Sequence, residues 1–408
     1  MDDVIYLDNA STTKIDPRVL EEMMPYLKES YGNPGNLHLF GREARDAVDK
    51  ARRQVADFLG VKDARCIVFT ASGTEANNMV FNSFGQMNEI YDVLISSIEH
   101  DSVIKAAGAL EGQFLDRRVY KVKPTDKGVI TLENLEKVIN EDCLRTYTDE
   151  DGETIQIVPT IGLVSVMYMN NETGMENPVA EIGHYCNEKG ILYHCDAVQA
   201  ASCLPIDVDE IGCDFLSISG HKIYGPKGIG ALYIRDFEKF SPLIRGGSRQ
   251  ERGLRGGTEN VPGIVGLGAA CQFLKDDMEE DNKAINEAEQ AFIEELLDGF
   301  ARNNYSYDIL HLNGGGHRRV YKTINLRVDG IDAETMMLVL DSMGVCVSAG
   351  SACSSREQKP SRVLLEMGLT PEEAREGFRI SFSKYTLEEE AIAAARKIVN
   401  AIMILGGN

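Results

Sequence analysis

The fold of this chain is decided by the sequence SGHKIYGPKG at residues 219–228. Apolar runs precede it at 213–218 and follow it at 229–234, and both have the length of buried strands. Glycine and proline mark the segment between them as a loop, so Lys222 is predicted to stand at the edge of a sheet. A lysine in this position either faces water in a structural turn or forms a Schiff base with a bound carbonyl compound.

The chain before this loop alternates short apolar runs with stretches of helical periodicity. Strands are predicted at 67–70, 91–97, 118–122, 160–169 and 191–195. Helices are predicted between them at 74–84, 102–110, 132–140 and 179–189. Because repeated strand–helix units align successive strands in the same direction, this order predicts an α/β fold whose mainly parallel sheet is covered by helices on both faces.

The character of the sequence changes after residue 262. A long helix is predicted at about 263–300, followed by strands at 309–312 and 323–328 and a helix at 334–341. Strands and helices that follow one long linking helix indicate a second, smaller α+β domain. We therefore predict a large α/β domain at 16–261 and a small α+β domain formed by 1–15 and 262–408.

The overall composition narrows the classes of protein to consider. The formal net charge is −22 and tryptophan is absent, which argues against a nucleic-acid-binding surface. The first residues lack the basic and apolar regions of a secretory signal, and no run approaches the roughly 20 apolar residues that cross a membrane. Nine cysteines without a C-x-x-C pair disfavour a zinc ribbon and suit a reducing compartment. We expect a cytoplasmic protein that binds neither membranes nor nucleic acid directly.

Four polar segments follow predicted strands, at the sheet edge where ligands of open parallel sheets bind. TASGTEAN at 70–77 leads into a helix, and its backbone could hold a phosphate or its hydroxyls could cap the helix. The other segments are Glu99-His100, NNETG at 170–174 and HCDAVQ at 194–199. Each alone has a structural alternative: a satisfied histidine, a turn, or a capping aspartate. Together with Lys222 they supply what pyridoxal phosphate (PLP) requires, including a carboxylate for its pyridinium nitrogen.

A further segment, VSAGSACSS at 347–355, surrounds Cys353 with small residues. It is too small and polar for a core strand, so we predict an exposed loop, at about 346–361, with an accessible thiol. Cys353 could be an incidental loop cysteine, but an exposed free thiol without a purpose is a liability, which favours a functional role. A metal site at His194, Cys195 and Asp196 is disfavoured because adjacent strand residues point to opposite faces, and no metal is expected.

Taken together, these motifs resemble the PLP-dependent cysteine desulfurases of the nitrogen-fixation and iron–sulfur assembly type, in the class V aminotransferase-like family. The resemblance covers nearly the whole chain, from YLDNASTT at 6–13 through YGNP at 31–34 and TEANN at 74–78 to the segments around Asp196, Lys222 and Cys353. It implies the PLP-dependent transferase fold of the aspartate-aminotransferase type, with a large, mainly parallel sheet domain and a smaller α+β domain. It also implies a homodimer.

The resemblance assigns roles to individual residues. The catalytic residues it implies are Lys222, which carries PLP, His100, which stacks on the ring and moves protons, and the nucleophile Cys353. Asp196 would pair with the pyridine nitrogen, and Asn171 and Gln199 would bond the phenolic oxygen. The residues implied around the phosphate are Gly73, Thr74, Ser219, His221 and, from the neighbouring subunit, Thr258. Arg379, supported by Asn33, would grip the substrate carboxylate with its guanidinium fork.

The implied activity is conversion of L-cysteine to L-alanine, with the sulfur transferred to the Cys353 thiolate as a persulfide. Lys222, with His100, would remove the α-proton. A sulfur-acceptor protein, either an iron–sulfur scaffold or a thiolation enzyme, would then receive the sulfur. The alternatives are a selenocysteine lyase or another PLP-dependent C–S lyase, which would not depend on Cys353, and a sulfur-relay scaffold that turns over little.

Two segments depart from the family pattern. SFSK at 381–384 replaces a usually glycine-containing segment just after Arg379, which leaves the fine geometry of substrate binding open. The acidic insertion at 149–154 is unusual, and we expect it to lie away from the site.

Overall fold

A computed structural model describes residues 4–87, 91–113, 117–143, 145–148, 154–157, 160–316, 319–320, 322–350 and 359–406. Its central sheet has seven strands in the order β2-β10-β9-β8-β7-β3-β4. Their bounds are β2 (Ile67–Thr70), β3 (Asp92–Ser96), β4 (Val119–Val122), β7 (Ile161–Ser165), β8 (Leu192–Asp196), β9 (Phe215–Ser219) and β10 (Gly230–Ile234). Neighbouring strands from β9 to β4 are parallel, whereas β10 is antiparallel to both β2 and β9. The predicted α/β fold with a mainly parallel sheet is confirmed.

Helices cover both faces of this sheet, because successive strand residues point to opposite sides. Val68 of β2 belongs to the apolar core beneath α3 (Gly73–Gly85) and α4 (Asp101–Gln113), and its neighbours Ile67 and Phe69 belong to the opposite core. The helices that contribute to this opposite core include α2 (Leu39–Phe58), α6 (Val179–Lys189), α7 (Val208–Ile211) and the first half of α8 (Val261–Arg302).

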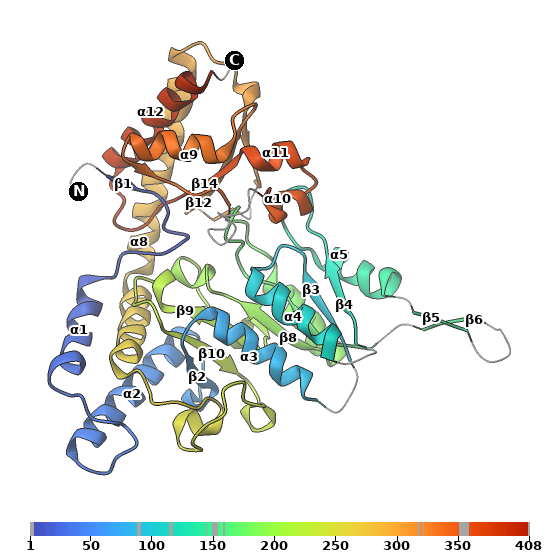
Figure 1. The fold of residues 1–408 in the computed structure, drawn as a ribbon, viewed down its shortest axis with the longest axis vertical. Helices are drawn as coiled ribbons and strands as arrows, with labels where there is room; N and C mark the ends of the chain where they lie inside the picture. Colours follow the sequence, from blue (N-terminus) through green and yellow to red (C-terminus); the bar gives the residue numbers. More distant parts are fainter. Residues whose placement is uncertain are drawn as a thin grey trace.

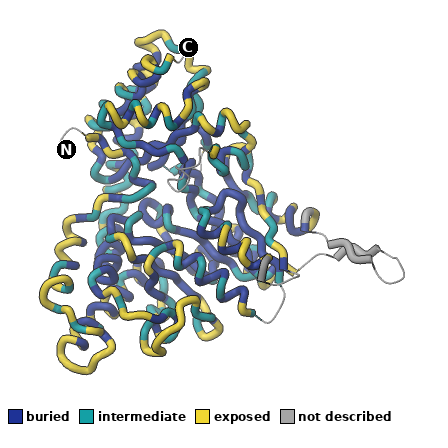
Figure 2. Tube along the Cα trace, viewed as in Figure 1, coloured by how far each residue is buried: buried dark blue, intermediate teal, exposed yellow. Residues whose placement is uncertain are grey.

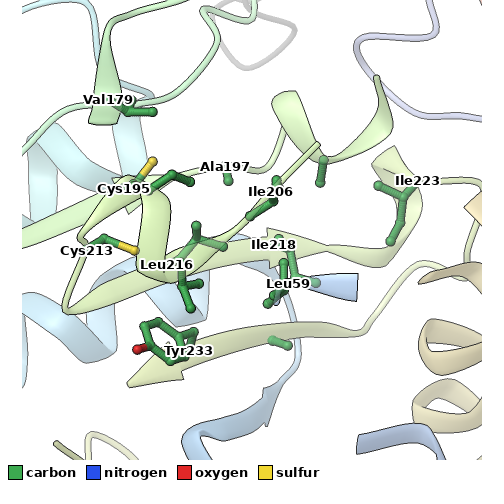
Figure 3. Close-up of a cluster of buried hydrophobic side chains, with 14 of the residues drawn as sticks. Leu59, Val179, Cys195, Ala197, Ile206, Cys213, Leu216, Ile218, Ile223 and Tyr233 are labelled. Atoms are coloured by element: carbon green, nitrogen blue, oxygen red, sulfur yellow. The ribbon is translucent and has the colours of Figure 1, made fainter. Parts of the chain in front are cut away.

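The centre of the sheet is wholly apolar on the face opposite α3. Figure 3 shows Leu216 and Ile218 of β9 with Tyr233 of β10, packed with Leu59 and Ile206 from the connecting segments. Every residue of β9 and β10 is buried, in agreement with the dark blue centre of the molecule in Figure 2. The strand that precedes Lys222 is therefore fixed by packing on both of its faces.

A second, smaller part of the molecule has a separate apolar core, which joins Leu7 to residues between 285 and 402. Three antiparallel strands lie in the order β11 (Leu310–Leu312), β12 (Thr323–Val328) and β14 (Gly377–Ser381). The strand β1 (Ile5–Tyr6) pairs in parallel with β13 (Val345–Cys346). The helices α9 (Ala333–Ser342) and α12 (Glu388–Leu405) contribute to this core, whereas the buried apolar residues of α10 (Arg362–Glu366) and α11 (Pro371–Glu376) belong to the first core. This separate core favours a second part of the molecule, and the domain boundaries at 15/16 and 261/262 stay a prediction.

The two parts are joined by α8, which is 42 residues long. Figure 1 shows it running from beside α1 (Pro17–Lys28) and α2 to the region of α9 and α12. Its buried residues from Val261 to Leu274 belong to the first core, and those from Ile285 to Phe300 line the second. One rigid helix therefore contributes to both hydrophobic cores.

The acidic insertion follows a short helix, α5 (Leu132–Lys137), at the far side of β4. The strands β5 (Arg145–Thr148) and β6 (Thr154–Ile157) pair with each other in an antiparallel ladder. Of the insertion predicted at 149–154, Thr154 begins β6, and residues 149–153 lie outside the described residues. No helix in the described ranges is long and apolar enough to cross a membrane.

Candidate active site

A cavity of about 270 Å³ lies at the edge of the central sheet, where residues of both parts of the molecule meet. Ten of the predicted site residues line it: Gly73, Thr74, His100, Asn171, Asp196, Gln199, Ser219, His221, Lys222 and Arg379. Asn33 and Thr258 each line a different cavity. Cys353 lies outside the described residues. Segments from widely separated parts of the sequence are therefore brought to one place.

Lys222 reaches this cavity from a tight turn that follows β9. Gly220 is required there, since a Cβ atom would lie 2.8 Å from the Pro226 carbonyl oxygen. The Nζ atom donates hydrogen bonds to the backbone oxygens of Ala10 and Ser11, the latter at 2.7 Å. Burial, and then the nearby charges of Arg379 and Lys322, lower the pKa of Lys222 from 10.5 to about 7. The amine is thus neutral for a large share of the time at neutral pH, as attack on a carbonyl requires.

Asp196 ends β8 and is 4% exposed. Its Oδ2 atom accepts a hydrogen bond from Asn77 Nδ2 at 2.8 Å, and its Oδ1 atom accepts one from the Val198 N–H at 3.0 Å. Three residues later, Gln199 donates from Nε2 to the Ala10 oxygen at 2.9 Å. Both side chains are held by fixed partners at the cavity wall.

The start of α3 has the geometry that favours an anion. Ser72 caps this helix by accepting a hydrogen bond from the Glu75 N–H at 3.2 Å, and Gly73 and Thr74 form the first turn beside the cavity. A Cβ atom on Gly73 would come within 2.7 Å of a Val198 methyl carbon, so the close approach requires glycine. The exposed N–H groups and the helix dipole favour an anion.

The residues opposite this helix start add further polar groups. Ser219 Oγ is buried and has no hydrogen-bond partner within the described part of the chain. Burial, followed by the charges of Lys222 and Lys227, lowers the pKa of His221 to about 4, so its imidazole is neutral near pH 7. A buried hydroxyl without a partner beside an anion site indicates a missing acceptor. A phosphate attached to a ring that reaches Asp196 and Lys222 fits these residues, so the site suits PLP.

Arg379 lies in β14 and is 2% exposed. Its guanidinium donates to the Asn171 oxygen at 2.8 Å, to Asp8 Oδ1 at 2.9 Å and to Ser11 Oγ at 2.7 Å. The Nε–H group has no acceptor among the residues that the structure describes. A rigidly held guanidinium with an N–H still to satisfy beside a cavity suits a carboxylate.

The segment SFSK at 381–384, which departs from the family pattern, contacts both parts of the molecule. Ser381 Oγ accepts a hydrogen bond from the Ala10 N–H at 2.8 Å, and so fixes the backbone whose oxygen receives Lys222. Lys384 is buried and pairs with Asp16 at 3.0 Å and with Asp281 at 3.2 Å. Of this segment, Ser381 contacts the cavity wall through the backbone of Ala10, and none of its four residues lines the cavity.

Four polar residues of the cavity wall were not predicted as site residues: Ser11, Ser72, Asn77 and Ser102. Asn77 lies one turn into α3, and Ser102 follows His100 by two residues. Asn77 and Ser102 could have been found from the sequence as polar side chains on the buried side of a helix, next to or within a motif that the sequence analysis quotes. Among the described residues, no group of His, Cys, Asp and Glu side chains is arranged to hold a metal ion.

Comparison with known proteins agrees with this geometry. Residues 5–393 match the family model described as aminotransferase class-V. The chain is 38% identical over 404 residues to a protein named cysteine desulfurase IscS from Rickettsia massiliae (strain Mtu5), covering 98% of this chain and 91% of that protein.

Solved structures show the same similarity. A structure named NIFS-like protein superimposes with a TM-score of 0.84 at 32% identity, covering 98% of this chain and all of the other. A structure described as SspA in complex with cysteine superimposes with a TM-score of 0.76 at 34% identity, covering 94% of this chain and 99% of that one. The similarity in fold therefore includes both parts of the molecule.

Proposed function

This chain belongs to the class-V aminotransferase family, together with relatives named cysteine desulfurase, and we propose that it is a PLP-dependent cysteine desulfurase. It converts L-cysteine to L-alanine and transfers the sulfur to Cys353. The observation that carries the proposal is one cavity lined by Lys222, by the Asp196 carboxylate, by the first turn of α3 and by the buried Arg379.

Different residues of the cavity would hold different groups of PLP. Lys222 would attach it, and the first turn of α3 with Ser219 and His221 would hold its phosphate. Asp196 would pair with the pyridine nitrogen, and Asn171 and Gln199 would bond the phenolic oxygen. When bound, PLP supplies an electron sink for the substrate's α-carbon. The neutral amine of Lys222 is the group suited to accept the α-proton, because its pKa lies near the working pH.

Arg379 binds the substrate carboxylate. Its three existing hydrogen bonds fix the guanidinium plane before the substrate arrives, so little entropy is lost on binding. The Nε–H group is available for one carboxylate oxygen. Asn33 lines a separate cavity, and its Oδ1 atom accepts a hydrogen bond from the Gly35 N–H. The predicted contribution of Asn33 to carboxylate binding therefore stays a prediction.

The position of the chain just before Cys353 supports its role as the sulfur acceptor. The backbone of Ser348 exchanges two hydrogen bonds with Arg379, so this segment runs beside the carboxylate-binding residue. Cys353 is three residues beyond Gly350, and three residues span at most about 10 Å. The Cys353 thiolate attacks the substrate sulfur: an S–S bond forms, the C–S bond breaks, and its electron pair stays with the carbon that becomes the alanine methyl group.

We also propose that the enzyme acts as a homodimer in the cytoplasm and delivers its sulfur to an acceptor protein of iron–sulfur cluster assembly or thiolation. Large apolar side chains are exposed together at the start of α2 and the loop before it, including Tyr31 at 77% and Leu37 at 75%. Such a patch favours contact with a second copy. Thr258 lines a cavity beside the end of β2, and we propose that it contacts the phosphate site of a second copy.

The proposal is tested by visible spectroscopy and product analysis of the purified chain. A yellow protein is expected to make alanine and sulfide in equal amounts from L-cysteine and a reductant. Cys353→Ser should keep the colour and lose both products, whereas Cys346→Ser, which alters a half-buried thiol on β13, should keep both. A colourless protein refutes the cofactor assignment. Undiminished turnover in Cys353→Ser favours a C–S lyase instead.

A further inference from the structure

A chain of hydrogen bonds connects His100 with Asp196 through two buried residues, Asn77 and Ser102. The Asn77 amide nitrogen donates to Asp196 Oδ2 and to Ser102 Oγ, both at 2.8 Å. Ser102 Oγ lies 2.8 Å from His100 Nδ1, and the Ser102 backbone nitrogen lies 3.1 Å from the same atom. Asn77 is 1% exposed and Ser102 is 8% exposed, and all four residues line the cavity. His100, which is predicted to stack on the PLP ring, is thus linked within the protein to Asp196, which is predicted to pair with the pyridine nitrogen.

The direction of these hydrogen bonds follows from groups that only accept or only donate. The Asp196 carboxylate accepts, so Asn77 must present its nitrogen to it, because a flipped amide would set oxygen against oxygen. Both amide hydrogens of Asn77 are then used, one on Asp196 and one on Ser102. Since Ser102 Oγ accepts from Asn77, its own hydrogen is free to point at His100 Nδ1.

The backbone N–H group of Ser102 independently indicates that Nδ1 of His100 accepts a hydrogen bond. An N–H group can only donate, so His100 Nδ1 must be the acceptor at 3.1 Å. A neutral imidazole carries one hydrogen, and when Nδ1 accepts, that hydrogen resides on Nε2. The two donors that converge on Nδ1 both belong to Ser102, in the first turn of α4.

We propose that Ser102 is a positioning residue that holds neutral His100 as its Nε2–H tautomer, and that Asn77 aligns the Ser102 hydroxyl from Asp196. The inference rests on the proposed function and deepens it. In this form His100 donates from Nε2 and has no unprotonated nitrogen free to accept a proton. Lys222 alone is then the group that receives the α-proton, and His100 serves as a hydrogen-bond donor within the cavity.

Nitrogen NMR of the full-length, cofactor-bound protein tests this, with ¹⁵N only in the histidine rings and alkaline buffer to keep the rings neutral. His100→Gln identifies the His100 signals among those of the seven histidines. The wild type is expected to show an unprotonated Nδ1 and a protonated Nε2. Ser102→Ala removes the hydroxyl and keeps the backbone donor, so the same tautomer is expected.

Ser102→Pro removes both donors, and the first turn of a helix tolerates proline. It is expected to move His100 toward the Nδ1–H form. Asp101→Pro, one position earlier in the same turn, keeps both donors and should match the wild type. Hydrogen on Nδ1 in the wild type overturns the proposal even without the proline variants. An unchanged tautomer in Ser102→Pro also overturns it. No substrate is needed, so the result is separate from that of the desulfurase assay.

Discussion

Lys222 is expected to react as a neutral amine at a pH where an ordinary lysine is almost wholly protonated. Its pKa falls from 10.5 to about 7 because the side chain is buried and lies near the charges of Arg379 and Lys322. At pH 7 this raises the neutral fraction roughly 10³-fold over that of an unperturbed lysine. Since only the neutral amine attacks a carbonyl, the rate at which PLP attaches should rise with pH and level off just above pH 7.

The causes of this shift can be separated by substitution. Lys322 is 1% exposed and donates to Ser202 Oγ, so Lys322→Met removes a buried cation while keeping most of the side-chain volume. The pKa of Lys222 should then rise. Lys227→Met is the matched control, because it removes an exposed charge from the same loop, and that charge is not among the causes of the shift.

The assay mixes PLP-free protein with PLP and follows attachment by absorbance, from well below to well above pH 7. The wild type and Lys227→Met should share a midpoint near pH 7, and Lys322→Met should have a higher one. If the wild-type rate climbs toward pH 10.5 without levelling off, the amine is not perturbed and the reasoning fails.

Two further predictions concern buried charges. Arg379→Lys should raise the KM for L-cysteine by roughly 10- to 100-fold, because a single ammonium cannot replace the guanidinium fork; unchanged steady-state kinetics would contradict the assigned role. Glu289, which pairs with Arg319, has its pKa raised to about 7 by burial. Its contribution to stability is complete below its ordinary pKa of 4.5 and is lost as the pH rises through about 7, a change of about 3 kcal/mol. In Glu289→Gln, urea unfolding should therefore lose this fall in stability between pH 4.5 and 7, and an unaltered pH profile would count against it.

Local sequence patterns predicted the elements that pack in the ordinary way. The strand at 323–328 and the helix at 179–189 coincide with β12 and α6. The strand β14 was not predicted, because its five residues include Arg379, whose burial depends on Asp8 in a distant segment. The pairing of β10 with β2 also depends on long-range contacts, whereas its antiparallel direction relative to β9 follows from the short connection at 220–229.

The site residues also fall into two groups: those that the order of the elements predicts and those that only tertiary contacts bring together. Lys222, Asp196 and His100 follow strands of one sheet, and this common edge is readable from the order of the elements. Asn77 and Ser102 are 25 residues apart, and their hydrogen bond exists only because α3 and α4 pack side by side. No local pattern reports such a contact. Asn33 and Thr258 line other cavities, and their predicted roles stay predictions.

The central claim is that sulfur passes from L-cysteine to Cys353. The most direct test is mass spectrometry of the peptide containing Cys353, after the wild-type protein has been treated with L-cysteine in the absence of reductant. The account predicts that this peptide gains one sulfur atom and that peptides containing the other eight cysteines do not. Alanine production without added sulfur on Cys353 would contradict it.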